Sequence, residues 1–180
     1  MRKIIKELAG WLVYIVIVVI IAWGFVTFVA QRTQVSGASM ETTLSDGDQL
    51  IVDKISYQFR EPERFEIIVF PYQYEAGTYY IKRIIGLPGE SVRIDEDGFI
   101  YINGEKLQES YGKEVMRDPG LAKDGIQLGA DEYFVLGDNR NDSMDSRMAE
   151  VGPIAGERII GRAWLRIYPF DQIGFLKHGS

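Results

Sequence analysis

The sequence predicts a mainly β domain preceded by one N-terminal transmembrane helix. An uncharged apolar run from Leu8 to Ala30 has the roughly 20 residues that a helix needs to cross the hydrocarbon core of a bilayer. Beyond this run, the apolar residues come in short stretches interrupted by Gly, Pro, Asn and Asp, which is typical of strands and turns. The chain has 180 residues, so about 150 remain for a single domain of ordinary size.

The apolar run is predicted to be an uncleaved anchor rather than a cleavable secretory signal. A cleavable signal has an apolar region of about 7–15 residues that ends in a small-x-small site. Here the run is longer, and the sequence Phe28-Val29-Ala30 puts a large residue where a small one is required. The length and the end of the run therefore both favour a membrane helix.

The flanking charges predict the orientation of this helix. Arg2, Lys3 and Lys6 precede the run, and only Arg32 follows it closely. Positive residues stay on the cytoplasmic side of a membrane. We therefore expect a single-pass protein of the cell membrane with a cytoplasmic segment 1–7, a transmembrane helix 8–30 and an extracytoplasmic domain 31–180.

Short apolar runs mark seven strands in the predicted domain. They cover Gln49 to Ile55, Glu66 to Pro71, Thr78 to Ile85, Ser91 to Asp95, Phe99 to Asn103, Tyr133 to Leu136 and Ile159 to Ile167. Glu96-Asp97-Gly98 supplies a short hairpin turn, because glycine adopts positive φ readily.

Two segments lack such a pattern. Glu105 to Ala130 is polar and without a sustained period, so we expect a flap or small lobe that contains a short hairpin or helix. Residues 91–136 are the predicted extent of this inserted lobe. The end of the chain, Leu176 to Ser180, is predicted to be a tail with His178 in solvent.

Composition excludes several classes of function. The net charge is −6, and an acidic domain lacks the electrostatic footprint that nucleic acid requires. The chain has no Cys and one His, so it has neither disulfides nor a thiolate nucleophile. Because His178 belongs to no motif, a Ser-His-Asp triad is excluded as well. Nucleophilic catalysis would need a hydroxyl that another base activates, and lysine is the candidate.

The candidate nucleophile is Ser39, in the sequence Val35-Ser36-Gly37-Ala38-Ser39-Met40. Its small neighbours allow a substrate carbonyl to approach the hydroxyl and a backbone N–H. The templates G-x-S-x-G and S-x-x-K both fail, because Glu41 and Thr42 stand at their last positions. Taken alone, the pattern also fits an ordinary loop serine.

The candidate base is Lys82, inside the predicted strand Thr78 to Ile85. Strand alternation puts Tyr80, Lys82 and Ile84 on one face. An amine desolvated by such neighbours has a lowered pKa and acts as a general base. The alternative is that Lys82 extends past its neighbours into water.

The densest polar motif runs from Gly137 to Arg147, directly after an apolar run. A calcium loop is disfavoured, because Arg140 and Ser143 occupy positions that should hold an acceptor and a glycine. Asp145 and Arg147 can form a charge-assisted pair that fixes the loop and leaves Ser143 to hold a lysine amine. The alternative is a polar loop of Asx turns. No cofactor and no metal are expected.

These three segments together resemble one family, the type I signal peptidases, which are membrane-anchored serine proteases with a Ser/Lys dyad. Ser36 to Leu44 resembles the family's nucleophile box, Tyr80 to Glu90 its lysine box, and Gly137 to Arg147 its third signature. The chain is similar to the short, Gram-positive-like members, because the region between Glu90 and Gly137 is short and Gly37 replaces an oxyanion-hole serine found elsewhere.

The resemblance implies a signal-peptidase-like β-sheet catalytic domain and a role for each residue. Ser39 is the nucleophile and Lys82 the general base, while Ser143 orients the amine and Asp145 with Arg147 supports the loop. The implied partners are the lipid bilayer and the signal peptides of exported preproteins, cut at small-x-small sites. The positions that match the substrate pockets are Val35, Met40, Leu44, Tyr80 and Ile81; their alternative role is core packing.

Two other classes of protein stay open at this point. A self-cleaving protease of the SOS-repressor type resembles signal peptidases in fold and dyad, but such proteins are cytosolic and DNA-linked. A membrane-tethered β-rich binding module would use the serine and the lysine only structurally. Cleavage of a preprotein with a small-x-small site separates the protease from the module.

Overall fold

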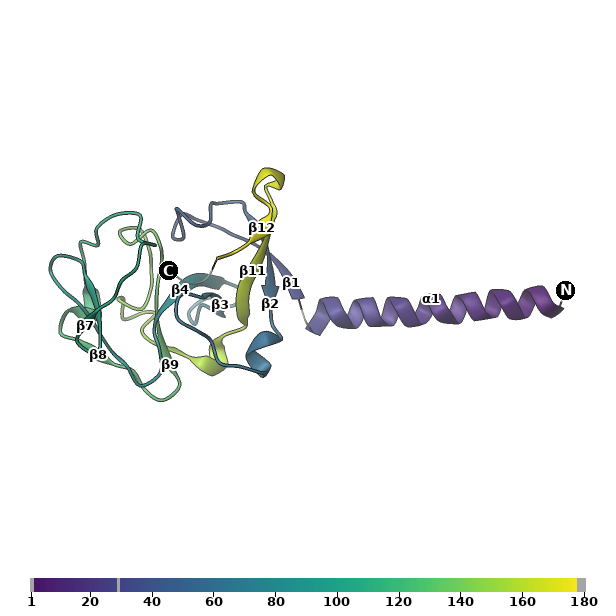
Figure 1. Cartoon of the computed structure of the whole chain (residues 1–180), viewed down its shortest axis with the longest axis horizontal. Coiled ribbons are helices and arrows are strands. Elements are labelled where there is room, and N and C mark those ends of the chain that lie inside the picture. Colours follow the sequence, from purple (N-terminus) through teal and green to yellow (C-terminus); the bar gives the residue numbers. More distant parts are fainter. Residues whose placement is uncertain (1, 29, 178–180) are drawn as a thin grey trace.

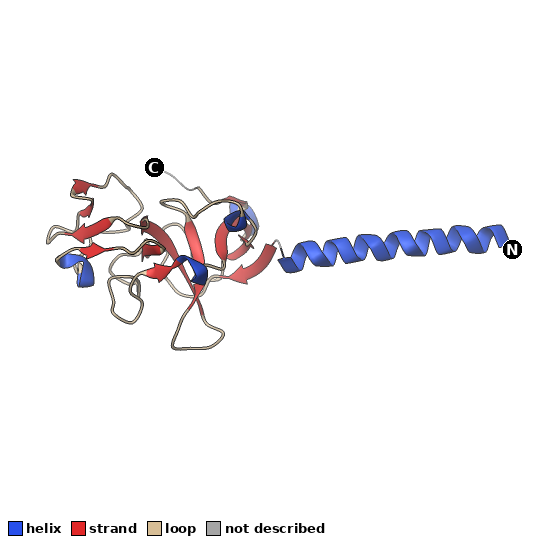
Figure 2. Ribbon diagram, turned by 90° about the horizontal axis from the view of Figure 1, so that it is seen from below, coloured by secondary structure: helices blue, strands red, loops and turns tan. Residues whose placement is uncertain are grey.

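The computed structural model describes residues 2–28 and 30–177. A long helix, α1 (Arg2–Phe28), extends away from a domain that holds the strands (Figures 1 and 2). The predicted mainly β class is confirmed for this domain. His178, predicted to be in solvent, lies outside the described residues.

The helix α1 covers most of the predicted span 8–30. Within residues 2–28 and 30–177, no helix is long and apolar enough to cross a membrane, so the predicted transmembrane helix is not found there.

The main sheet is antiparallel and forms most of the domain. Its order is β1 (Ala30–Gln34), β2 (Gln49–Asp53), β11 (Gly161–Tyr168), β3 (Ile67–Pro71), β4 (Tyr79–Gly86), β9 (Glu132–Leu136) and β10 (Ile154–Ala155), with β12 (Gly174–Phe175) paired to β11. Among the described residues, β1 pairs only with β2, so one of its edges is free there. Short 3₁₀ turns complete the domain, at Ser56–Gln58, Gly120–Lys123, Gly156–Arg158 and Phe170–Gln172.

A second, smaller sheet is inserted between β4 and β9. Its order is β7 (Glu105–Lys106), β6 (Ile100–Ile102), β5 (Ser91–Ile94) and β8 (Ile126–Gln127). Gly98, in the predicted turn between β5 and β6, has a φ of 81°. The sheet ends at Gln127, so β9, which the predicted lobe 91–136 includes, belongs to the main sheet instead.

The seven predicted strands correspond to β2, β3, β4, β5, β6, β9 and β11. The strands that the sequence missed are β1, whose sequence Ala-Gln-Arg-Thr-Gln is polar, and four strands of two residues each. Such segments carry little apolar periodicity from which to predict them. The β6–β7 hairpin nevertheless has a signal in Asn103-Gly104, whose φ values of 52° and 85° are those of a type I′ turn.

Buried side chains lie on both faces of the main sheet. On β3, Ile67 packs in a cluster with Met40 and Leu44, whereas Ile68 packs in another with Val135. This explains why β3 is a continuous apolar run rather than an alternating one. A third cluster, which includes Ile85 and Val92, joins the two sheets.

The prediction of a solvated tail is wrong for Leu176. This side chain is buried in the cluster of Met40 and Leu44, and its backbone N–H donates to Trp164 O at 2.9 Å. A single apolar residue near the end of the chain forms no periodic pattern, so the sequence did not predict its burial. Packing against the nucleophile loop is favourable because it removes apolar surface from water.

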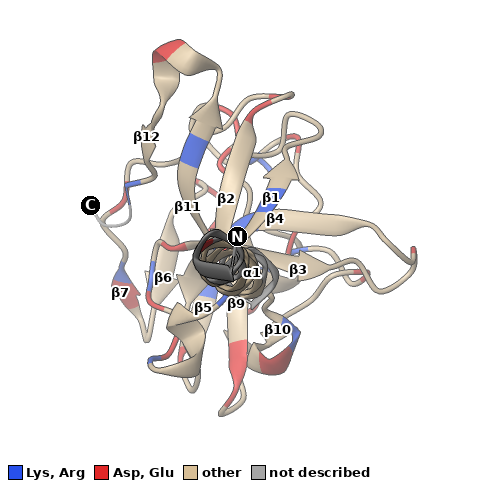
Figure 3. Ribbon diagram, turned by 90° about the vertical axis from the view of Figure 1, so that its right-hand side faces the viewer, with Lys and Arg blue, Asp and Glu red and all other residues tan. Residues whose placement is uncertain are grey.

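Acidic and basic residues are interspersed around the domain when it is viewed along α1 (Figure 3).

Candidate active site

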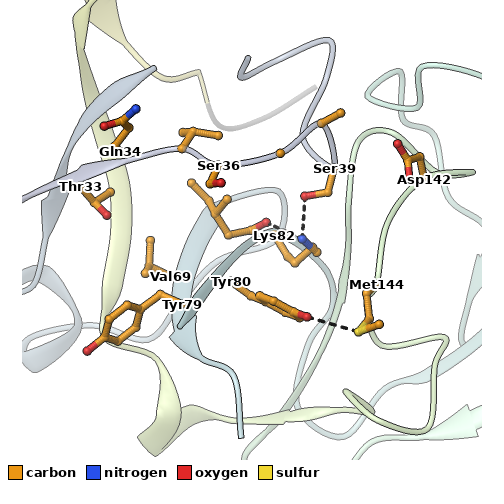
Figure 4. A pocket seen from close by; sticks show the side chains of 14 residues that line it. Thr33, Gln34, Ser36, Ser39, Val69, Tyr79, Tyr80, Lys82, Asp142 and Met144 are labelled. Atoms are coloured by element: carbon orange, nitrogen blue, oxygen red, sulfur yellow. Dashed lines mark hydrogen bonds between the residues drawn. The ribbon is translucent and has the colours of Figure 1, made fainter. Parts of the chain in front are cut away.

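The fold brings together three segments that are far apart in sequence. Ser39 lies in the loop after β1, Lys82 lies on β4, and residues 137–147 form the loop after β9. Lys82 Nζ is 2.8 Å from Ser39 Oγ, and it also donates to Ile81 O at 3.0 Å (Figure 4). Three strands separate β1 from β4 in the sheet order, so this contact joins the free edge of the sheet to its interior.

The nucleophile loop is held by short-range contacts on both sides of Ser39. Gly37, with a φ of 90°, donates its N–H to Asp46 Oδ1 at 2.9 Å, a conformation that favours glycine. On the other side, Thr43 and Leu44 donate their N–H groups to Met40 O at 2.9 and 2.8 Å. The serine is therefore presented by a turn whose apolar residues are anchored in the core.

Lys82 is almost completely buried, with 3% of its surface exposed. Burial lowers the pKa of its amine to about 8, and the negative charges of Asp145 and Asp138 oppose this shift without overcoming it. The amine also lies 5.1 Å from the centre of the Tyr80 ring. Lys82 therefore does not extend into solvent, which was the alternative interpretation of its sequence position.

Asp145 and Arg147 form the predicted pair. Arg147 Nε and Nη2 donate to the two carboxylate oxygens of Asp145 at 2.8 and 2.9 Å, and both side chains are buried. Arg147 also donates to Arg140 O and to Asp118 O. Because a two-pronged arginine–carboxylate pair fixes both orientation and distance, this pair sets the shape of the loop.

Ser143 does not make the predicted contact with Lys82. Its Oγ is buried and has no hydrogen-bond partner among the described residues. It lies instead against Gly137, where an added Cβ would meet Ser143 Oγ at 2.2 Å and Ser39 O at 2.5 Å. Because Gly137 has no side chain, the loop 137–147 can lie directly against the nucleophile segment at this point.

A second buried ion pair went unnoticed in the sequence. Arg83 Nε and Nη2 donate to Asp138 at 2.8 and 2.7 Å, and neither side chain is exposed. Thr43 Oγ1 donates to Asp138 Oδ2 at 2.5 Å, and Arg83 Nη1 donates to Phe65 O at 2.8 Å. Arg83 itself could have indicated this pair in the sequence, because an arginine inside an apolar strand requires a buried partner.

The polar segment 109–118 lies across the loop 137–147. Glu109 accepts two hydrogen bonds from Arg140, at 2.8 and 3.0 Å, and Lys113 N donates to Asp138 O at 2.9 Å. The Arg83 guanidinium stacks 3.6 Å from the centre of the Tyr111 ring. The segment predicted as a flap is therefore a strap that holds the candidate site in place.

A cavity of about 260 Å³ opens beside the Ser39–Lys82 contact. Of the predicted substrate-pocket residues, Val35, Tyr80 and Ile81 line it. Met40 and Leu44 do not, and this part of the prediction is corrected: both are fully buried in the core beneath the loop. The hydrogen-bonded turn after Ser39 directs both side chains into the core, so they support the cavity from beneath.

The cavity lies between two unpaired stretches of strand. In the part of the chain that the structure describes, one edge of β1 is free. The pairing of β4 with β9 begins only at Arg83, so residues 79–82 are unpaired on that side within the same part. Free strand edges offer N–H and C=O groups to an extended peptide. The arrangement can hold such a peptide beside a hydroxyl and a desolvated amine.

Comparison with known proteins defines the class. The sequence matches the family described as signal peptidase, peptidase S26, over residues 8–168. It is 42% identical over 163 residues to a probable signal peptidase I-2 of Synechocystis sp., which covers 88% of this chain and 72% of that protein. It is 36% identical over 177 residues to a signal peptidase I of Bacillus licheniformis, which covers 93% and 92%. A crystal structure of a signal peptidase I from Enterococcus faecalis V583 is 35% identical and covers 57% of this chain and 97% of that one, with a TM-score of 0.48.

The sequence similarities extend over most of the chain and are those of an enzyme. The chain belongs to the signal peptidase family, peptidase S26. The prediction that the chain is a serine endopeptidase of the signal peptidase I type is confirmed by this family membership.

Because the Arg83–Asp138 pair is buried, we expect the effects of mutating its two residues on the free energy of unfolding to be strongly coupled. Arg83→Met alone should lower the free energy of unfolding by about 3–5 kcal/mol, because it leaves a carboxylate buried without its partner. The double variant Arg83→Met, Asp138→Leu should cost less than the sum of the two single variants. Urea unfolding of the four proteins measures this coupling.

The exposed pair Lys113–Glu41, at 2.8 Å, is the matched control. Its coupling should be below about 1 kcal/mol. A coupling at Arg83–Asp138 as small as that of the control would show that the buried pair does not hold the site together.

Proposed function

We propose that this enzyme removes N-terminal signal peptides from exported preproteins, with Ser39 as nucleophile and Lys82 as general base. The observation that supports it most directly is the 2.8 Å approach of Lys82 Nζ to Ser39 Oγ inside a cavity. With a pKa of about 8, roughly one amine in ten is uncharged at pH 7, and the uncharged form can accept a proton.

In the proposed reaction, the proton of Ser39 Oγ moves to Lys82 Nζ as Oγ bonds to the scissile carbonyl carbon. The oxyanion that forms is stabilised by donors that include the backbone N–H of Ser39. The Lys82 ammonium then gives its proton to the leaving amine as the C–N bond breaks. Water then gives a proton to the same amine as its oxygen bonds to the acyl carbon. That proton passes to Ser39 Oγ as the bond between the acyl carbon and Oγ breaks, which restores the hydroxyl and the neutral amine.

The supporting residues act by position. Asp145 receives two hydrogen bonds from the Arg147 guanidinium, one from the Arg147 backbone N–H at 3.3 Å and one from the N–H of Gly137 at 3.1 Å. This keeps the loop, and with it Ser143, against the nucleophile segment. The buried Ser143 Oγ has no partner among the described residues, which leaves it free to orient the lysine amine in the proposed mechanism.

The substrate fits as an extended segment between β1 and β4. Val35 and Ile81 line the cavity from these two sides, and Tyr80 lines it beside Lys82. A cavity of about 260 Å³ is small, which favours short side chains at the positions before the cut. Alternation along an extended peptide points its first and third residues to the same side, as a small-x-small site requires.

Cleavage of a preprotein with a small-x-small site tests this proposal. Ser39→Ala and Lys82→Met should each lower kcat/KM at least about a thousandfold, because the two groups act as a unit. The assay compares them with the full-length unmutated enzyme. Ser91→Ala, on β5 of the smaller sheet, and Lys123→Met change the same residue types outside the cavity and should cleave like the unmutated protein. Cleavage by Ser39→Ala at a rate near that of Ser91→Ala would contradict the proposal.

We also propose that residues 8–30 anchor the enzyme in the cell membrane, with residues 1–7 cytoplasmic and the β domain outside. The support is the absence of charge from Leu8 to Ala30 and the three positive residues before it. The side chains from Trp11 to Ile21 are 45–67% exposed, an apolar surface that lipid would cover. An anchor holds the active site in the thin layer where the substrate's own apolar segment resides.

Flotation with liposomes tests the anchor. The full-length chain should float with the vesicles. Lysines at Val16 and Ile20 should release much of it, because each charge at the centre of a span costs about 2.5–3.5 kcal/mol. The matched control places lysines at Phe59 and Val115, which are 82% and 72% exposed on the β domain, and should float like the unmutated chain. Failure of the unmutated chain to float would contradict the anchor.

A further inference from the structure

The catalytic cavity has a charged end that the proposed reaction does not use. Figure 4 shows Thr33 and Gln34 at one side of the Ser39–Lys82 contact and Asp142 and Met144 at the other, and all four residues line the cavity. Tyr80 Oη donates to Met144 Sδ at 3.3 Å, which joins β4 to the loop beside Asp142.

The Asp142 carboxylate is not neutralised by a neighbour. Its side chain makes no ion pair or hydrogen bond with the described part of the chain; only its backbone N–H is bonded, to Asn139 O at 3.0 Å. The negative charge of Asp142 contributes to the raised pKa of Lys113, but the Lys113 ammonium is paired with Glu41 at 2.8 Å. Glu114 lies near the same lysine and pairs with Arg117 at 3.6 Å. The rim on this side therefore keeps an unpaired negative charge.

This end of the cavity is where a peptide continues after the cut. If Val35 and Ile81 receive the residues before the scissile bond, as in the proposed function on which this inference rests, the scissile carbon lies at Ser39 Oγ. An extended chain advances about 3.3 Å per residue. Its next residues therefore pass Met144 and Asp142 on their way out of the cavity.

We propose that Asp142 determines specificity on the far side of the cut: it favours a cationic side chain, and disfavours an acidic one, in the first two residues after the scissile bond. A carboxylate at a solvent-exposed rim changes the free energy of a nearby charge modestly. The expected consequence is a several-fold selectivity among substrates rather than a requirement for catalysis.

Three otherwise identical peptides, with Lys, Gln or Glu in the second position after a small-x-small site, test this inference with the full-length enzyme. The rate on each charged peptide is divided by the rate on the Gln peptide within the same enzyme. At low salt, the Lys peptide should be cut about five- to twentyfold faster than the Glu peptide. In 1 M salt, where the Debye length is about 3 Å, the ratio should fall toward one.

Variants at Asp142 separate charge from structure. Asp142→Asn should bring the Lys-to-Glu ratio close to one, and Asp142→Lys should reverse it. Asp171→Asn removes the same charge from an exposed residue that does not line the cavity and should keep the ratio of the unmutated enzyme.

The possible failures are distinguishable. If the unmutated enzyme cuts none of the three peptides, the proposed function fails and this inference falls with it. If it cuts the Gln peptide but shows the same Lys-to-Glu ratio before and after Asp142→Asn, the proposed function survives and the role of Asp142 is overturned. Equal loss on all three peptides would also overturn it, because a purely structural residue would have that effect.

Discussion

The ion pair between Arg83 and Asp138 is the contact on which the candidate site depends. It joins β4 to the loop after β9, and through Thr43 it reaches the nucleophile loop. Arg83 and Lys82 are neighbours on one strand, so their side chains leave opposite faces. The pair therefore fixes the position of the strand from one face while Lys82 approaches Ser39 from the other.

The same arrangement keeps a reactive fraction of the Lys82 amine uncharged near neutral pH. The two carboxylates that raise its pKa, Asp145 and Asp138, each receive two hydrogen bonds from an arginine, and neither bonds to the amine. Burial is therefore the larger effect, and the pKa falls to about 8. The folded protein then binds fewer protons than the unfolded chain between about pH 8 and 10.5. Lys82 thus lowers the free energy of unfolding below about pH 8, and this cost disappears as the pH rises toward 10.5.

The sequence predicted those parts of the site that carry a local pattern. Alternation along Thr78 to Ile85 predicted β4 and placed Lys82 among apolar neighbours, and Asp145 and Arg147 are close enough in the chain for their pairing to be foreseen. The partners that depend on the folding of the sheet were not predictable: Arg83 meets Asp138 across 55 positions, and Glu109 meets Arg140 across 31. Met40 and Leu44 were assigned to the substrate because the motif places them beside Ser39, but the turn after Ser39 directs them into the core.

The titration of Lys82 is the most direct test of whether burial lowers the pKa of its amine enough for it to act as a base. NMR of the full-length protein labelled with ¹³C and ¹⁵N at lysine would follow the Lys82 side-chain signals with pH, assigned by their loss in Lys82→Met. The buried amine should titrate with a midpoint at about 8, while Lys113, whose pKa is raised by its hydrogen bond to Glu41, should titrate far higher in the same spectra. A Lys82 midpoint near the ordinary lysine value of about 10.4 would contradict the proposed mechanism, because fewer than about one amine in a thousand would then be uncharged at pH 7 and able to take the proton of Ser39.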